Sequence, residues 1–249
     1  MSGHSKWATT KHRKGAKDSA RGKLFAKLIR QVEVAAREGG GDMTSNATLR
    51  TMFAKARGAS VPLDTIERAI KRGTGELEGV RYESVSYEGY APSGVALIVE
   101  CLTDNRNRTG ADIRMIFSRN GGSMAEPGAV SWQFERKGVV ITPKTVGEDD
   151  LMATALDAGA EDLADEGTEW VITSAAADLH GLRTALEEAS IPIESSDLEM
   201  VASQRVAIDS EATAKRVLKL IDLLEEHDDV QNVWSNVDIP QEILESIEV

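Results

Sequence analysis

The chain has 249 residues, of which 41% are hydrophobic and 4% aromatic, so it can bury two or three small cores. Its single cysteine, Cys101, excludes an internal disulfide and any metal site built from several cysteines. The net charge of −12 is spread unevenly: residues 1–72 carry +10, residues 73–137 carry −2 and residues 138–249 carry −20. This asymmetry predicts a basic binding domain on an acidic body that would itself repel nucleic acid.

The sequence carries no segment suited to a membrane. No run approaches the roughly eighteen apolar residues of a membrane-spanning helix. The positive charges at the N-terminus are not followed by the apolar stretch of a secretory signal. We therefore expect a soluble, cytoplasmic protein without a membrane partner.

The N-terminal segment concentrates the positive charge. Between Lys6 and Arg30, nine Lys or Arg stand against one acid, Asp18. A basic arm that carries an aromatic residue is typical of polyanion binding, and the alternative is an ordinary solvated terminus. The predicted nucleic-acid-binding residues are His4, Lys6, Trp7, Lys11, His12, Arg13, Lys14, Lys17, Arg21, Lys23, Lys27 and Arg30.

Trp7 is predicted to stack on a base. It lies twelve residues ahead of the first amphipathic helix and has no neighbouring apolar stripe to join. The alternative is that Trp7 folds back to enlarge the thin core of a small domain.

Three helices are predicted after the arm. In the first, residues 19–37, helical spacing puts an apolar stripe opposite a basic face. The second runs to Arg57 with Thr44 or Ser45 as its cap, and the third begins near Ser60 and stops at Gly73. The apolar stripe of the first helix consists of Phe25, Leu28, Ile29, Val32, Ala35 and Ala36.

From Tyr82 the apolar period changes to two, which indicates strands. The predicted strands are 82–90, 94–103, 130–135, 138–142, 168–173, 191–194, 199–208 and 230–237. The predicted helices are 109–120, 148–158, 177–189 and a strong one from Ser210 to Glu226.

This order of elements predicts an α+β protein with a three-helix first domain and two ferredoxin-like α/β domains, each with an antiparallel sheet. A sequential division near residue 145 would leave one α/β domain short of a helix, so we expect one domain inserted in the other. The predicted boundaries are 1–75 for the basic arm and helical domain, 76–130 with 206–249 for the first α/β domain, and 131–205 for the acidic insert.

No catalytic or cofactor motif stands out in the sequence. It lacks a phosphate-binding glycine loop followed by Lys-Ser/Thr, a Gly-x-Gly-x-x-Gly, a His-Glu-x-x-His and a Gly-x-Ser-x-Gly. Cys101 lies in a strand-like apolar run, which favours a buried, inert thiol. We predict a protein that is not an enzyme, with no catalytic residues, no metal site and no cofactor.

Long ordered runs of this chain resemble the YebC family. They are Gly3-His-Ser-Lys-Trp-Ala, His12-Arg-Lys-Gly-Ala, Arg21-Gly-Lys-Leu-Phe-Ala-Lys-Leu-Ile-Arg, Ala59-Ser-Val-Pro, Ile70-Lys-Arg-Gly, Tyr87-Glu-Gly-Tyr-Ala-Pro, Leu102-Thr-Asp-Asn-Arg-Asn-Arg-Thr and Asp229-Val-Gln-Asn-Val-Trp-Ser-Asn-Val. The resemblance covers nearly the whole chain, and only residues 143–200 match loosely. Trp234 departs from the family, which more often carries another aromatic residue there.

The resemblance implies a bacterial protein related to a mitochondrial translational activator of cytochrome c oxidase. It also implies a translation factor that acts on ribosomes stalled at proline-rich stretches, with its first domain on ribosomal RNA. The alternative is the older description of the family, a regulator of transcription that binds duplex DNA. An irregular arm rich in Gly, Ser and Lys suits RNA better than a DNA reader, which normally presents a recognition helix. The oligomeric state is left open.

Overall fold

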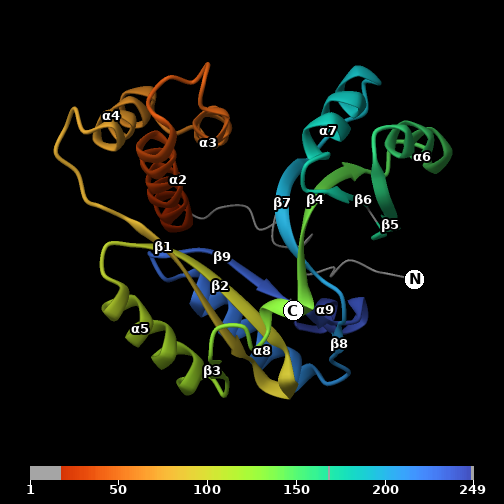
Figure 1. Ribbon diagram of the computed structural model, residues 1–249. Coiled ribbons are helices and arrows are strands. Elements are labelled where there is room, and N and C mark those ends of the chain that lie inside the picture. Colours follow the sequence, from red (N-terminus) through yellow and green to blue (C-terminus); the bar gives the residue numbers. More distant parts are fainter. Residues whose placement is uncertain (1–17, 168, 248–249) are drawn as a thin grey trace.

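Three helices form the first domain of the computed structural model, which describes residues 18–167 and 169–247 (Figure 1). They are α2 (Asp18–Gly39), α3 (Ala47–Gly58) and α4 (Leu63–Thr74). Val32, Leu49 and Ile66, one from each helix, are completely buried and belong to a single apolar core. The predicted three-helix domain and the apolar stripe of its first helix are confirmed, with Phe25 and Ile29 at the half-buried edge.

Two helix ends differ from the prediction. Asn46, rather than Thr44 or Ser45, caps α3: its Oδ1 accepts a hydrogen bond from the Leu49 amide at 2.9 Å. The Asn46 amide group also donates to the carbonyl oxygens of Ala35 in α2 and of Gly40 just after it, which a hydroxyl could not do. The helix α4 continues through Gly73 to Thr74, and Gly75 follows as its C-cap with a φ of 84° in the left-handed region.

Gly73 serves close packing between α4 and α2. A Cβ atom at this position would overlap the carbonyl oxygen of Glu33 and lie 2.7 Å from the Cβ of Ala36. We expect Gly73→Ala to destabilise the domain by about 1–3 kcal/mol, since both obstacles belong to a packed helix. In thermal or urea unfolding, the control Gly58→Ala should be neutral or slightly stabilising, because nothing lies within 4 Å of its added Cβ. Equal effects of the two substitutions would contradict this packing argument.

The first α/β domain is built on a four-stranded antiparallel sheet of order β3-β1-β2-β9. Its elements are β1 (Glu83–Tyr90), β2 (Ala96–Thr103), α5 (Arg106–Arg119), β3 (Ser123–Ala125), α8 (Glu211–Glu225) and β9 (Val230–Ser235). The helices α5 and α8 cover one face of this sheet, where Phe117, Leu97 and Ile221 lie in the largest apolar core. The other face is turned toward the remaining two domains (Figure 1).

The second α/β domain has a separate antiparallel sheet of order β5-β6-β4-β7. Its elements are β4 (Phe134–Pro143), α6 (Glu148–Asp157), β5 (Ala160–Asp165), β6 (Glu169–Ala175), α7 (Leu179–Glu188) and β7 (Ser195–Ala202). Because β9 returns to pair with β2 after this sheet is complete, the second domain is inserted in the first. The predicted α+β class, with a three-helix domain and two antiparallel α/β domains, is therefore confirmed.

Several strand predictions in and around the insert were wrong. Residues 134–143 form one continuous strand, so the predicted gap at residues 136–137 is absent. Gly138 in this strand lets α7 approach, since an added Cβ would lie 2.7 Å from the Leu179 Cβ. Residues 191–194 form no strand, because Ile191 closes the end of α7 through a hydrogen bond from its amide to the Leu186 carbonyl.

Short elements complete the chain. They are the 3-10 turns Pro92–Gly94 and Ser131–Gln133, the parallel pair β8 (Val206–Ala207) and β10 (Val237–Asp238), and α9 (Gln241–Ile247). We propose the domain boundaries 75/76, 130/131 and 205/206, which fall in the connections between the helical domain and the two sheets.

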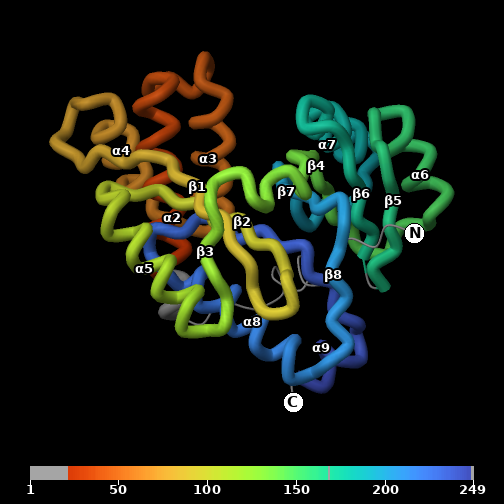
Figure 2. The backbone as a smooth tube through the Cα atoms, turned by 60° about the horizontal axis from the view of Figure 1, so that its bottom comes forward, coloured from red at the N-terminus to blue at the C-terminus, as the bar shows by residue number. Residues whose placement is uncertain are grey.

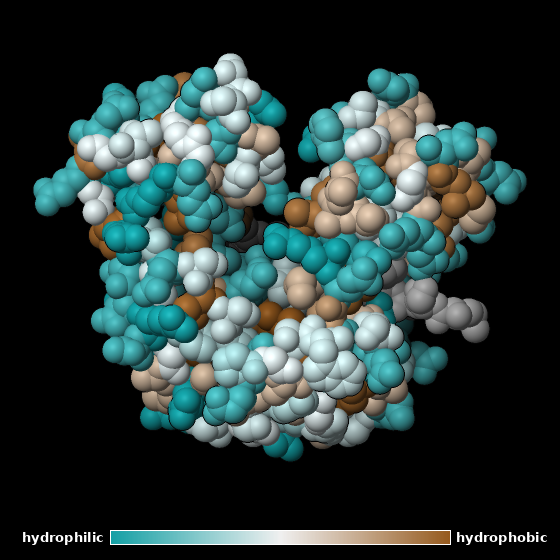
Figure 3. All heavy atoms as spheres, viewed as in Figure 1, coloured by the Kyte–Doolittle hydropathy of each residue, from teal (hydrophilic) through white to brown (hydrophobic). Residues whose placement is uncertain are grey.

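The helical domain and the insert stand apart above the first sheet. Figures 1 and 2 place α2–α4 and β4–β7 on opposite sides of a gap, and the space-filling view is hollowed between the two lobes (Figure 3). No helix among the described residues is long and apolar enough to cross a membrane.

Candidate nucleic-acid interface

The structure locates three of the predicted binding side chains. Lys23, Lys27 and Arg30 lie on α2 with helical spacing that puts them on one side, away from the buried stripe. Arg21 belongs to the first turns of α2, but its side chain lies outside the described part. The other predicted residues also lie outside it: His4, Lys6, Trp7, Lys11, His12, Arg13, Lys14 and Lys17.

All three located cations contact the C-terminal end of α8. The Lys23 Nζ donates to the Glu226 carbonyl oxygen at 3.1 Å, and the Lys27 Nζ donates to the Glu225 carbonyl oxygen at 2.8 Å. Since α8 ends at Glu225, these oxygens have no following helical turn to satisfy them, and the helix dipole adds negative potential there. Cations near the end of a helix are stabilising for both reasons.

Arg30 completes this contact. Its Nη1 donates to the Asp228 carbonyl oxygen at 2.6 Å and to Asp229 Oδ1 at 2.9 Å, and its guanidinium lies 5.4 Å from the centre of the Tyr82 ring. We call this contact the α2–α8 junction. Its donors are Lys23, Lys27 and Arg30, and its acceptors are the carbonyl oxygens of Glu225, Glu226 and Asp228 with the Asp229 carboxylate.

Asp229 is the buried member of the junction, with 3% of its surface exposed. Its second oxygen accepts from the Thr109 hydroxyl at 2.7 Å and from Arg108 Nη2 at 2.9 Å. Burial alone would raise the pKa of Asp229, but the bonds from Thr109 and Arg108 and the charge of Arg30 outweigh it and lower the pKa. Asp229 is therefore an anion at neutral pH.

Sequence reasoning missed the role of Asp229. The residue opens a recognised family run, and it lies three residues after the acidic end of a strong predicted helix. Those signals single out Asp229 but do not predict its partner Arg30, because the two residues are 199 positions apart in the chain.

Other cations of the helical domain are used inside it. The carboxylate of Glu33, 3% exposed, accepts from Arg72 Nε at 2.8 Å and from Arg37 Nη2 at 3.4 Å. The Arg72–Glu33 pair joins α4 to α2, and the Arg37–Glu33 pair lies within α2, so both arginines are engaged inside the helical domain.

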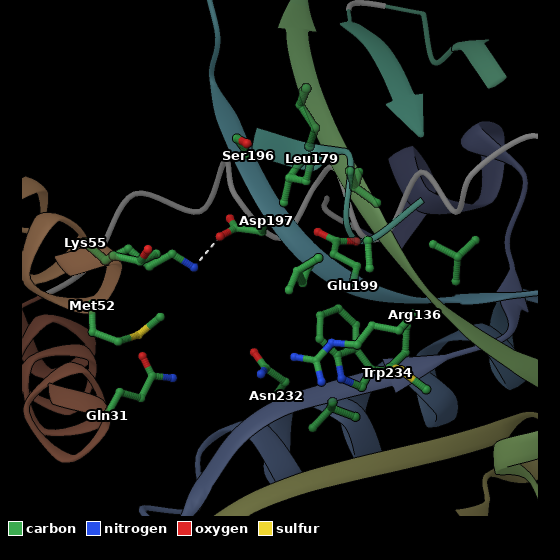
Figure 4. A pocket seen from close by; sticks show the side chains of 18 of the residues that line it. Gln31, Met52, Lys55, Arg136, Leu179, Ser196, Asp197, Glu199, Asn232 and Trp234 are labelled. Atoms are coloured by element: carbon green, nitrogen blue, oxygen red, sulfur yellow. Dashed lines mark hydrogen bonds and ion pairs between the residues drawn. The ribbon is translucent and has the colours of Figure 1, made fainter. Parts of the chain in front are cut away.

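A cleft of about 680 Å³ opens between the three domains. Gln31 and Met52 line it from the helical domain, Arg136 and Glu199 from the insert, and Trp234 from β9 (Figure 4). An ion pair between Lys55 of α3 and Asp197 of β7 crosses the cleft (Figure 4). Because the walls carry charges of both signs, the cleft lacks the uniformly positive lining of a nucleic-acid channel.

Two observations concern metal binding and the reactivity of the single cysteine. Within residues 18–167 and 169–247, no group of three or more His, Cys, Asp or Glu side chains is placed to hold a metal ion. Cys101 is buried on β2, as predicted, and burial raises the pKa of its thiol to about 12. A thiol with that pKa stays protonated at neutral pH and is a poor nucleophile.

Comparison with known proteins accounts for nearly the whole chain. Residues 5–76 match the TACO1/YebC protein N-terminal domain, and residues 82–237 match the TACO1/YebC second and third domain. Relatives named "Probable transcriptional regulatory protein" are 55% identical in Parafrankia sp. (strain EAN1pec), over 99% of both chains, and 55% identical in Thermobifida fusca, over 99% of this chain and 100% of the relative. These relatives are named as regulators and not as enzymes.

A solved structure has the same fold. The crystal structure of a conserved hypothetical protein from Aquifex aeolicus is 45% identical, covers 93% of this chain and 97% of its own, and superposes with a TM-score of 0.83. Domain matches over both halves and full-length relatives above 50% identity lead to one conclusion. The chain belongs to the TACO1/YebC family.

Proposed function

We propose that this protein is a nucleic-acid-binding regulator of gene expression whose basic first domain contacts RNA. The observation that carries the proposal is the charge division, with +10 in residues 1–72 and −22 in the rest of the chain. Long-range repulsion by the body would orient a polyanion toward the first domain. The names of the relatives support a regulatory role.

The finer proposal is a ribosome-associated translation factor. The arm combines cations with Trp7 and His12, which suits threading among RNA phosphates and stacking on unpaired bases. The family resemblance adds the expected target, ribosomal RNA of ribosomes stalled at proline-rich stretches. On this proposal the protein relieves the stall by binding, with no catalytic residue, metal or cofactor of its own.

The second candidate is a transcriptional regulator on duplex DNA, which the names of the relatives favour. A DNA-reading helix needs an exposed face whose side chains reach base edges in the major groove. The basic face of α2 contacts the end of α8 instead. In this arrangement α2 therefore does not present its basic face to a major groove.

Sedimentation of cell lysate separates the two candidates. We expect the protein to travel with ribosomes at low salt, to leave them at high salt, and to be released by ribonuclease but not by deoxyribonuclease. Co-sedimentation with DNA, lost on deoxyribonuclease treatment, would support the transcriptional role instead.

The stall-relief proposal has its own test. In a translation extract depleted of this protein, a reporter with a proline run should be translated poorly and should recover on adding the protein back. A matched reporter without the run should be unaffected by either step. Equal responses of the two reporters would count against a role at proline-rich stretches.

A further inference from the structure

The helical domain has an apolar core of its own. Every buried residue of that core lies between Leu28 and Ala69, and its half-buried neighbours lie between Phe25 and Ile70. The cores of the two α/β domains are formed by other residues, beginning at Ala91. The helical domain therefore does not share a hydrophobic core with the body, which we define as residues 82–247.

Ionic and polar contacts connect the two parts. In the α2–α8 junction the helical domain supplies the cations and the body supplies the oxygen acceptors. In the Lys55–Asp197 pair across the cleft, the helical domain again supplies the cation and the body the carboxylate. The cations of these contacts are exposed or half-exposed, so each contact is weak and screened by salt, and a junction of this kind can open reversibly.

The acceptors at the junction present the chemistry of a nucleic-acid backbone. Carbonyl oxygens at a helix C-terminus and a carboxylate offer negative potential and several acceptor atoms, as phosphates do. Lys23, Lys27 and Arg30 cannot satisfy both at once. A phosphate backbone would therefore compete with the end of α8 for the same face of α2.

Opening the junction leaves its buried carboxylate with partners. If Arg30 withdraws, Asp229 keeps the Thr109 hydroxyl and Arg108, which belong to the same domain as Asp229. Asp229 is therefore not left as a buried charge without partners, and the open arrangement avoids the free-energy cost of such a charge.

We propose that the α2–α8 junction is an intramolecular latch: the end of α8 occupies the basic face of α2, and RNA displaces it and releases the helical domain from the body. The inference rests on the proposed RNA binding and adds a mechanism to it. Affinity for RNA is then lowered by the fraction of molecules that are latched.

The first test weakens the latch without touching a cation. In the full-length protein, Asp229→Asn should tighten binding of a single-stranded polyuridylate by about three- to tenfold, since fewer molecules start latched. The control Asp157→Asn removes the same charge from an exposed position on α6 and should leave the affinity within about twofold. Asp197→Asn, which removes the second cross-domain pair, should shift the affinity in the same direction as Asp229→Asn.

The second test needs no change at the latch. Fluorophores on Ala47→Cys in α3 and Ala189→Cys after α7, both exposed, report the separation of the two lobes. The native Cys101 is buried and should not be labelled. Saturating polyuridylate, or high salt alone, should change the energy transfer between the labels.

The outcomes distinguish the two proposals. If the protein does not bind polyuridylate or ribosomes, the proposed function fails. If polyuridylate binds, yet the energy transfer stays constant and Asp229→Asn and Asp197→Asn bind as the unsubstituted protein does, the latch is wrong while the proposed function stands.

Discussion

Raising the salt concentration from about 50 mM to about 200 mM is expected to weaken RNA binding about 250- to 4,000-fold. We expect the first domain to neutralise roughly 6 to 8 phosphates, and each contributes about −0.7 to the slope of log affinity against log salt for a single strand. The predicted slope is therefore near −4 to −6, measurable by fluorescence anisotropy with a labelled oligonucleotide.

The separate core of the helical domain supplies the control for this experiment. A fragment of residues 1–75 retains that core, so it should fold alone and keep the steep salt dependence. A fragment of residues 76–249 carries the negative charge and should not bind. A slope near zero, or binding by the second fragment alone, would contradict the electrostatic proposal.

Trp7→Ala is expected to weaken RNA or ribosome binding by about 5- to 150-fold, because stacking one base on an aromatic ring is worth about 1–3 kcal/mol. The melting temperature should change little, since Trp7 is predicted to contact RNA and not a core. Trp7 is also the only tryptophan before Trp132, so its fluorescence can be followed in the fragment of residues 1–75 and should be quenched by RNA.

Trp132 provides a matched control. It is an equally large side chain, 70% exposed, but it lies on the acidic body. Trp132→Ala should leave the affinity for RNA unchanged. A blue-shifted emission of Trp7 in the free fragment, together with a lower melting temperature of Trp7→Ala, would mean that Trp7 belongs to the fold.

Local patterns were sufficient for much of the fold. The three- to four-residue spacing of apolar side chains in α2 predicted its buried residues Leu28, Val32, Ala35 and Ala36. The count of helices on either side of residue 145 predicted the insertion, and the sheet order confirms it. These features depend on residues within one or two helical turns of each other or on the order of the elements. Both can be read directly from the sequence.

Glycines and caps were less predictable. Gly73 was predicted to stop a helix and Gly138 to begin a strand, but each lies inside an element where another backbone or helix approaches closely. The same residue type serves chain reversal and close packing, and only the neighbouring element distinguishes the two. Asn46 was overlooked for a similar reason, since its amide also bonds to carbonyl oxygens of α2 and the turn after it.

The basic face of α2 shows where sequence reasoning ends for the candidate site. Helical periodicity placed Lys23, Lys27 and Arg30 on one face, and composition set that face against an acidic body. The contact between this face and the end of α8 depends on the path of the chain. After forming one α/β domain inserted in the other, the chain returns beside its first helix some 200 residues later. Periodicity reports which side of a helix is polar, whereas its partner is set by the path of the whole chain.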